Sequence, residues 1–213
     1  MGGVNPTGQV KKTRTVAIFG NEIGNRFVHL VHWGRGGNLE ITTPYIADFE
    51  VGRREVSAHI MQVAKLSTNV RLVVAPPSPP PHTKCRSADP LKCYRCLGAA
   101  RKVDLLDRYS QFATELMVKS NLHAKIYVAT NPGGRKLCLT GSVNLTRQGF
   151  FDKAELGIYT TDPDLIGQIE TITQIWKSPR NLPAVQDYRT WRKDFLVQYP
   201  GIVTLLGLKA KWN

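Results

Sequence analysis

The sequence predicts an α/β protein built around one compact core. Its 213 residues are about 42% hydrophobic, which is enough for one sizeable core and makes two full domains the less favoured division. Short runs that read as strands alternate along the chain with longer stretches in which apolar residues recur at helical spacing. Such an alternation is typical of a sheet covered by helices.

The first third of the chain predicts three strands and two helices. Residues 14–20 form a short apolar run that reads as a buried strand, and a helix follows over 22–33 and ends at the glycines of the stretch GRGG. Residues 38–46 read as the second strand. Apolar residues then recur at helical spacing, which predicts an amphipathic helix over 51–67, and 70–75 reads as the third strand.

A long loop separates this part from the rest of the predicted domain. The loop covers residues 76–100, and the apolar positions over 103–117 again predict a helix. Residues 122–129 and 136–142 read as two strands, and the proline and glycines between them suit a hairpin turn. Beyond them we expect a strand over 154–161 and a helix over 162–176.

The charge of the chain indicates a polyanionic partner. The net charge is +13 and the sequence pI is about 9.8. Lysine and arginine spread over a surface neutralise phosphates, so we expect nucleic acid to bind; simple solubility and attraction to an anionic membrane are the alternatives. No run approaches the roughly 20 apolar residues of a membrane span. We therefore expect a soluble, cytoplasmic protein with no stable membrane association.

Four polar residues gather at the ends of the two predicted hairpin strands. On a strand His123 and Lys125 would project from the same face. Gly141 permits a close backbone approach and sets Ser142 and Asn144 beside that face. An imidazole, an ammonium, a hydroxyl and a carboxamide together suit a phosphate, with His123 as the nucleophile or proton carrier and Lys125 as the charge clamp.

Glu155 lies on the next predicted strand and is placed to accept a hydrogen bond from the second ring nitrogen of His123. Such a carboxylate fixes the tautomer of a catalytic histidine and raises its basicity. The whole set, namely His123-x-Lys125, Gly141-Ser142-x-Asn144 and Glu155, resembles the phospholipase D superfamily. The family pattern usually adds an acid after the lysine, whereas this chain has Thr130 in that place.

The resemblance implies a mixed sheet flanked by helices and a site made from two His-x-Lys elements. One histidine would attack phosphorus to form a phosphohistidine, and the other would protonate the leaving oxygen. Because this chain supplies one such element, the resemblance implies a homodimer, and no catalytic metal is required. The catalytic domain would span residues 1–178 with 76–100 as an insert, followed by a basic and aromatic extension over 179–213.

The resulting expectation is a metal-independent endonuclease, with DNA favoured over RNA as its substrate. Two alternatives remain. The first is a nucleic-acid-binding protein without catalytic activity, in which the residues of the former active site only bind phosphate. The second is a phospholipid phosphodiesterase, for which we would expect an exposed apolar rim or anchor, and the sequence indicates none.

The insert carries a separate cluster of potential metal ligands. His82 and Cys85 are separated by two residues, as are Cys93 and Cys96, and two such pairs can form a tetrahedral Cys₃His site that is typical of structural zinc. Another histidine in place of His82, unligated thiols in a loop, or a disulfide are the alternatives. The fourth cysteine, Cys138, reads as a small core residue.

The extension interleaves aromatic residues with cations in the stretches YRTWRKDF and LKAKWN. Such a pattern is found where proteins stack on bases and cover phosphates. A packing arm in a dimer is an equally good interpretation of the same residues.

Overall fold

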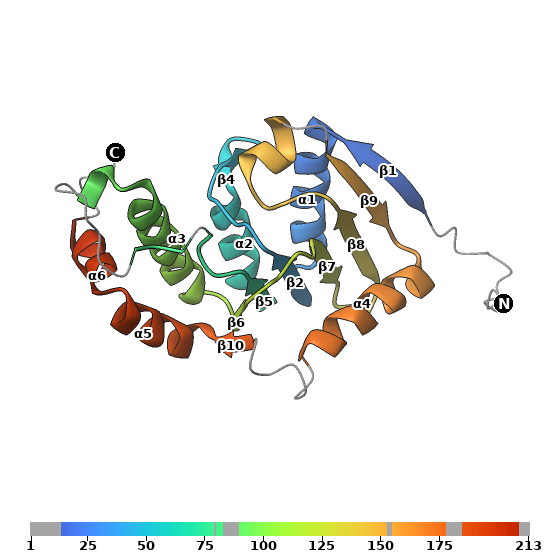
Figure 1. Cartoon of the computed structure of the whole chain (residues 1–213). Helices are drawn as coiled ribbons and strands as arrows, with labels where there is room; N and C mark the ends of the chain where they lie inside the picture. The colour runs from blue at the N-terminus through green and yellow to red at the C-terminus, as the bar shows by residue number, and fades with distance from the viewer. Residues whose placement is uncertain (1–13, 79, 83–89, 153–154, 178–184, 209–213) are drawn as a thin grey trace, which may run out of the picture.

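Within the part of the chain that the structure describes, a mixed sheet of eight strands forms the centre of the molecule (Figure 1). The computed structural model describes residues 14–78, 80–82, 90–152, 155–177 and 185–208. The strand order is β1-β9-β8-β7-β2-β5-β6-β10, in which β2, β5 and β6 run parallel and the other neighbours pair antiparallel. The strands of this sheet are β1 (Thr15–Phe19), β2 (Asn38–Thr43), β5 (Asn69–Val74), β6 (Glu115–Lys119), β7 (Ile126–Thr130), β8 (Lys136–Gly141), β9 (Leu156–Thr160) and β10 (Val185–Asp187).

Helices cover both faces of the sheet. Because side chains alternate along a strand, Tyr127 and Ala129 of β7 enter the main core, whereas Ile126 and Val128 face the opposite side. Residues of α1, α2 and α3 fill the main core, and α4 packs against Ile126 and Val128. The helices are α1 (Asn21–Trp33), α2 (Val56–Ala64), α3 (Tyr94–Ser110), α4 (Pro163–Lys177), α5 (Tyr188–Gln198) and α6 (Pro200–Gly207), with a 3₁₀ turn (Pro90–Lys92) and a π-helical turn (Gln148–Asp152).

The predicted α/β class is confirmed, and several predicted boundaries are corrected. The second predicted helix is shorter at both ends, and a small hairpin of β3 (Glu50–Val51) and β4 (Arg54–Glu55) precedes it. The strand expected over 122–129 begins only at Ile126. The hairpin between β7 and β8 forms as predicted, with Ile126 opposite Thr140.

Strand β6 is missing from the sequence prediction. Residues 103–117 were expected to form one helix, but α3 begins earlier, at Tyr94, and ends at Ser110. Leu116 and Val118 are buried on alternate positions of β6, which pairs in parallel with β5. The N-terminal half of α3 therefore occupies part of the predicted loop over 76–100.

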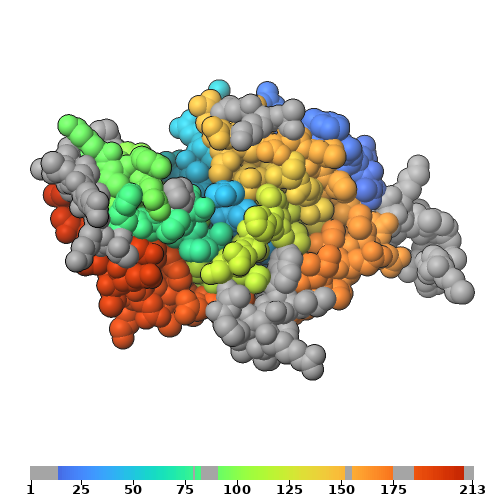
Figure 2. Space-filling model, in the orientation of Figure 1, coloured from blue at the N-terminus to red at the C-terminus, as the bar shows by residue number. Residues whose placement is uncertain are grey.

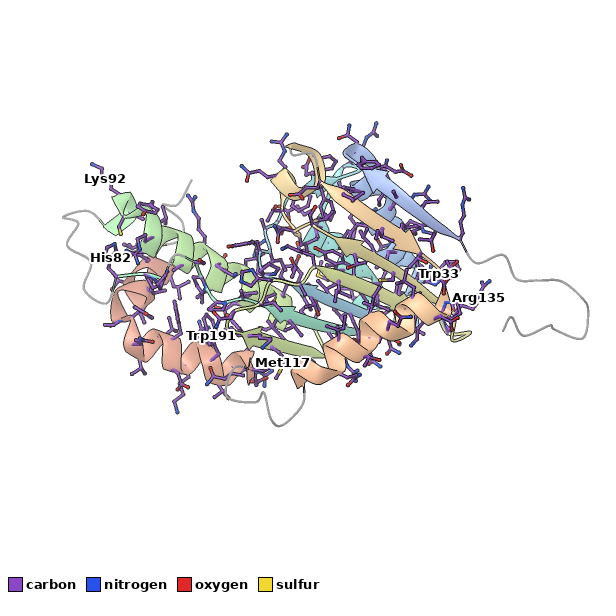
Figure 3. All side chains as sticks on the ribbon, turned by 45° about the vertical axis from the view of Figure 1, so that its right-hand side comes forward. Trp33, His82, Lys92, Met117, Arg135 and Trp191 are labelled. Atoms are coloured by element: carbon purple, nitrogen blue, oxygen red, sulfur yellow. The ribbon has the colours of Figure 1, made fainter. Side chains whose placement is uncertain are left out.

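The described part of the C-terminal extension is built into the same fold. Strand β10 joins the sheet beside β6, and α5 and α6 lie together with α3 at one end of the molecule (Figure 1). Tyr188, Trp191 and Phe195 belong to the main core, and Figure 3 shows Trp191 beside Met117 of β6. Since these aromatic side chains are buried, they are not available to stack on bases, and that interpretation of them is wrong.

Candidate active site

His123 and Lys125 lie on the segment that leads into β7, at the edge of the sheet where β2 and β8 end. The Thr140 hydroxyl donates to the Lys125 carbonyl oxygen at 2.9 Å, which ties this segment to β8. The Lys125 ammonium donates to the His123 carbonyl oxygen at 2.7 Å. His123 itself is exposed, so an incoming substrate can reach its ring.

Gly141 ends β8 with a backbone that other residues rarely adopt. Its φ is +141°, and a Cβ at this position would lie 2.2 Å from the Leu156 carbonyl oxygen. Glycine therefore lets β8 approach β9 closely just before Ser142. The Gly-Ser-x-Asn pattern has a structural reason at this position, as the sequence predicts.

Ser142 is held between Glu155 and Leu156. Its hydroxyl donates to the Glu155 carboxylate and accepts from the Leu156 backbone N–H at 3.2 Å, while its own N–H donates to the Leu156 carbonyl oxygen at 3.1 Å. The expected partner of Glu155 was the His123 ring. Among the residues that the structure describes, Glu155 pairs with Ser142 instead, because it precedes β9 directly opposite the end of β8.

The turn after Ser142 rests on buried groups of β2 and β7. The Tyr127 hydroxyl donates to the Val143 carbonyl oxygen at 2.7 Å. Burial raises the pKa of Tyr127 well above its ordinary value, with a smaller contribution from the Glu155 carboxylate, so the phenol remains a neutral donor. The buried Thr43 hydroxyl accepts from the Leu145 N–H at 3.4 Å. These two supporting residues were missed by sequence reasoning, because nothing local relates Thr43 to a turn about 100 residues later.

Asn144 carries an unusual polar atom. Its side-chain oxygen is buried and finds no hydrogen-bond partner within the described residues. Leaving a buried acceptor without a donor costs about 1–3 kcal/mol, so proteins rarely retain one without a reason. The backbone of Asn144 is fixed at the same time by Gly149, where a Cβ would lie 2.4 Å from the Asn144 carbonyl oxygen.

The structure thus brings together the segments that carry the five predicted residues. His123 and Lys125 precede β7, Ser142 and Asn144 follow β8, and Glu155 precedes β9, with all three strands adjacent. The arrangement offers an exposed imidazole, an ammonium and a hydroxyl next to a carboxylate. The catalytic roles of these residues stay predictions.

The predicted zinc ligands are only partly described. Cys85 lies outside the described residues. His82 is exposed, Cys93 is the residue before α3, and Cys96 is buried in the first turn of that helix. His82 and Lys92 lie at the same end of the molecule in Figure 3. Within the described ranges no group of three or more potential ligands could hold a metal ion.

Comparison with known families gives a match over this whole region. Residues 36–176 match the sequence model of the PLD-like domain described as that of cardiolipin synthase, which is about two thirds of the chain and includes every predicted catalytic residue. The chain belongs to the phospholipase D superfamily. A comparison with curated protein sequences finds no match.

Several solved structures of low sequence identity share the fold of this chain. The phospholipase D family member Nuc from Salmonella typhimurium superposes with a TM-score of 0.51 at 13% identity, covering 83% of this chain and 99% of that one. NucT from Helicobacter pylori superposes with a TM-score of 0.52 at 10% sequence identity. The match covers 83% of this chain and 100% of NucT. Phosphatidylserine synthase from Haemophilus influenzae Rd KW20 superposes with a TM-score of 0.57 at 19% sequence identity. The match covers 83% of this chain and 40% of the synthase. At sequence identities this low, the similarity shows a shared fold and nothing further.

Proposed function

We propose that this protein is a phosphodiesterase that cleaves nucleic acid, with DNA favoured, at a site shared by two copies of the chain. The observation that carries the proposal is the placement of His123-x-Lys125 at the start of β7, beside the Gly141-Ser142-x-Asn144 turn at the end of β8. Membership of the phospholipase D superfamily supports it, because that pattern is the one through which the sequence resembles the family.

In the proposed reaction, a ring nitrogen of His123 attacks phosphorus and the bond to the leaving oxygen breaks. The second copy's imidazole gives its proton to that oxygen, then takes a proton from a water molecule that attacks the phosphohistidine and releases the His123 nitrogen. Lys125 offsets the negative charge on the phosphoryl oxygens, and the amide of Asn144 donates to them. The Ser142 hydroxyl has one proton, which it donates to Glu155 in the free protein and turns to a phosphoryl oxygen when substrate binds. Glu155 orients the Ser142 hydroxyl.

A homodimer is supported by an exposed apolar sheet face that adjoins the site. Phe19 of β1 is 61% exposed and lies opposite Leu156 of β9, which is 45% exposed. Ile158 extends the same face at 37% exposure. Leu156 hydrogen-bonds to Ser142, so two copies that pair through this face would bring their sites together. The buried side-chain oxygen of Asn144 has no hydrogen-bond donor within the described residues, as would be expected if a second copy of the chain supplied that donor.

A phospholipid phosphodiesterase is the second candidate. It is favoured by the cardiolipin synthase description of the matching family and by the similarity to a phosphatidylserine synthase. The net charge of +13 favours nucleic acid, which presents phosphates along its whole length. Within the described part of the chain, no helix combines the length and apolar composition that crossing a bilayer requires.

The deciding experiment is a cleavage assay in EDTA with separate substrates. We expect the purified protein to cut labelled DNA, and to leave phosphatidylglycerol and cardiolipin vesicles unchanged. Turnover of lipid alone would favour the second candidate. Binding of nucleic acid without cleavage of DNA or RNA, in single or double strands, would favour a catalytically silent binding protein.

Structural zinc is proposed as a separate feature of the insert, with His82, Cys85, Cys93 and Cys96 as ligands. We expect one zinc per chain by elemental analysis of the purified protein, because four such ligands would close a tetrahedral site. Cys93→Ser should lose the metal and lower the melting temperature of the protein. Cys138→Ala is the matched control and should keep the zinc. Wild-type protein with far less than one metal per chain would contradict the proposal.

A further inference from the structure

A cleft lies beside the candidate active site, between α3 and the ends of two parallel strands. Its volume is about 1030 Å³. One wall is the segment 45–48 after β2, another is 77–78 after β5, and the third is the face of α3 between 94 and 108. Figure 2 shows the teal segment that follows β5 next to the yellow-green segment that leads into β7.

The cleft carries an excess of positive charge. Asp48 and Asp104 also line it, but Arg108 pairs with both, at 3.1 and 3.8 Å. With four cations against these two acids, the lining has a net charge of +2, so the field in the cleft is positive. The cations of the lining are Arg95, Arg101, Lys102 and Arg108.

Lys102 joins the two strand ends at the base of the cleft. Its ammonium donates to the carbonyl oxygens of Pro44, after β2, and Pro76, after β5, at 3.1 and 3.4 Å. Burial lowers the pKa of Lys102 to about 8, so the side chain is cationic at neutral pH and loses its charge as the pH rises above that value. The ammonium has three N–H donors, and two carbonyls leave one for a ligand.

Two exposed aromatic rings accompany these cations. Tyr94 begins α3 and is 75% exposed, and Tyr45 on the opposite wall is 47% exposed. Both rings belong to the lining of the cleft, so their faces are open to a ligand that enters it. Aromatic faces beside cations are the surface on which unstacked bases bind, whereas the bases of a duplex are already stacked on one another.

The cleft is structurally continuous with the candidate catalytic turn. Ile46 forms a parallel bridge with Leu145, and the Ala47 N–H donates to the Leu145 carbonyl oxygen at 2.8 Å. Leu145 directly follows Asn144. One wall of the cleft is therefore hydrogen-bonded to the turn that carries Ser142 and Asn144. A polynucleotide lying in the cleft would pass next to that turn.

We propose that this cleft binds the single-stranded nucleotides that flank the scissile phosphate. Tyr94 and Tyr45 stack on bases, and Arg95 and Arg101 contact the neighbouring phosphates. The inference rests on the proposed function and adds the strand form of the substrate, which is single-stranded. A duplex reaches the dispersed surface cations but not the aromatic faces.

The test measures binding separately from cleavage, in full-length protein that carries His123→Ala. Fluorescence anisotropy would give the affinity for a labelled single strand of about 12 nucleotides, within the usual footprint of such grooves, and for the duplex of the same sequence. Tyr94→Ala should weaken single-strand binding about tenfold or more and change duplex binding by less than about twofold. Tyr94→Phe, which keeps the stacking face, should bind like the parent.

Lys65→Ala is the matched charge control, because Lys65 follows α2 and lies outside the cleft lining. Arg101→Ala should weaken single-strand binding more than Lys65→Ala does. Equal single-strand affinity in Tyr94→Ala and the parent would overturn the inference, as would an equal loss for single strand and duplex. Binding of phosphatidylglycerol vesicles that depends on Tyr94, with none of oligonucleotides, would also overturn it.

The outcomes separate this inference from the proposed function. A wild-type protein that cuts DNA while Tyr94→Ala binds and cuts single strands equally well would overturn only the role of the cleft. A wild-type protein that never cuts, but binds single strands through Tyr94, would overturn only the proposed function.

Discussion

Replacing His123 with alanine should abolish phosphodiester cleavage and leave nucleic-acid binding nearly unchanged. The imidazole is the proposed nucleophile, and removing a nucleophile that acts with a second catalytic group lowers the rate by about four orders of magnitude or more. Binding comes instead from many dispersed cations in a chain of net charge +13. Gel-based cleavage in EDTA and anisotropy on the same preparation would measure the two effects.

The melting temperature provides the control for this variant. His123 is exposed, so the substitution should not change the stability of the fold. Lys125→Ala should lower both cleavage and binding, because the ammonium contacts the phosphate before and during the reaction. A His123→Ala protein that cuts at the wild-type rate, free of contaminating nuclease, would refute the proposed mechanism.

Phe19→Glu should convert the proposed dimer into an inactive monomer. Pairing through the β1–β9 face would place two copies of the new carboxylate in an apolar interface, where unpaired charges are strongly unfavourable. Cleavage should fall by at least about 100-fold, because each site would lose the second imidazole. Light scattering should give a mass near that of one 23.8 kDa chain, against twice that value for the wild type.

Val197→Glu is the matched control for Phe19→Glu. Val197 is 77% exposed but lies on α5, in the C-terminal part of the structure. It should leave both the dimer and the activity intact. A wild-type protein that is monomeric and fully active, or a Phe19→Glu variant that remains dimeric, would contradict the shared site or its proposed interface.

The catalytic segments were predictable because their signals are local. The proline and glycines of the hairpin turn fix the pairing of β7 with β8, and that pairing alone brings Lys125 beside Gly141. The partner of Glu155 was not predictable in the same way. The choice between the His123 ring and the Ser142 hydroxyl depends on where β7 and β9 begin, to within one or two residues.

Elements with ambiguous periodicity were misassigned. Leu116 and Met117 continue the helical spacing of the preceding apolar residues, so β6 was taken as the end of a helix, although Leu116 and Val118 alternate as in a strand. In the C-terminal part, Trp191 and Phe195 are spaced by four residues on α5 and pack into the core. Their basic neighbours favoured a nucleic-acid interpretation, because the sequence does not reveal which face of α5 meets α3 and β6.

The stereochemistry at phosphorus tests the central claim most directly. Cleavage of a phosphorothioate linkage of known configuration in ¹⁸O-labelled water gives a chiral product, and each in-line displacement inverts the phosphorus centre. The phosphohistidine mechanism requires two displacements, first by His123 and then by water, so it predicts overall retention of configuration. Overall inversion would show that water attacks the phosphorus directly, and would contradict the assignment of His123 as the nucleophile.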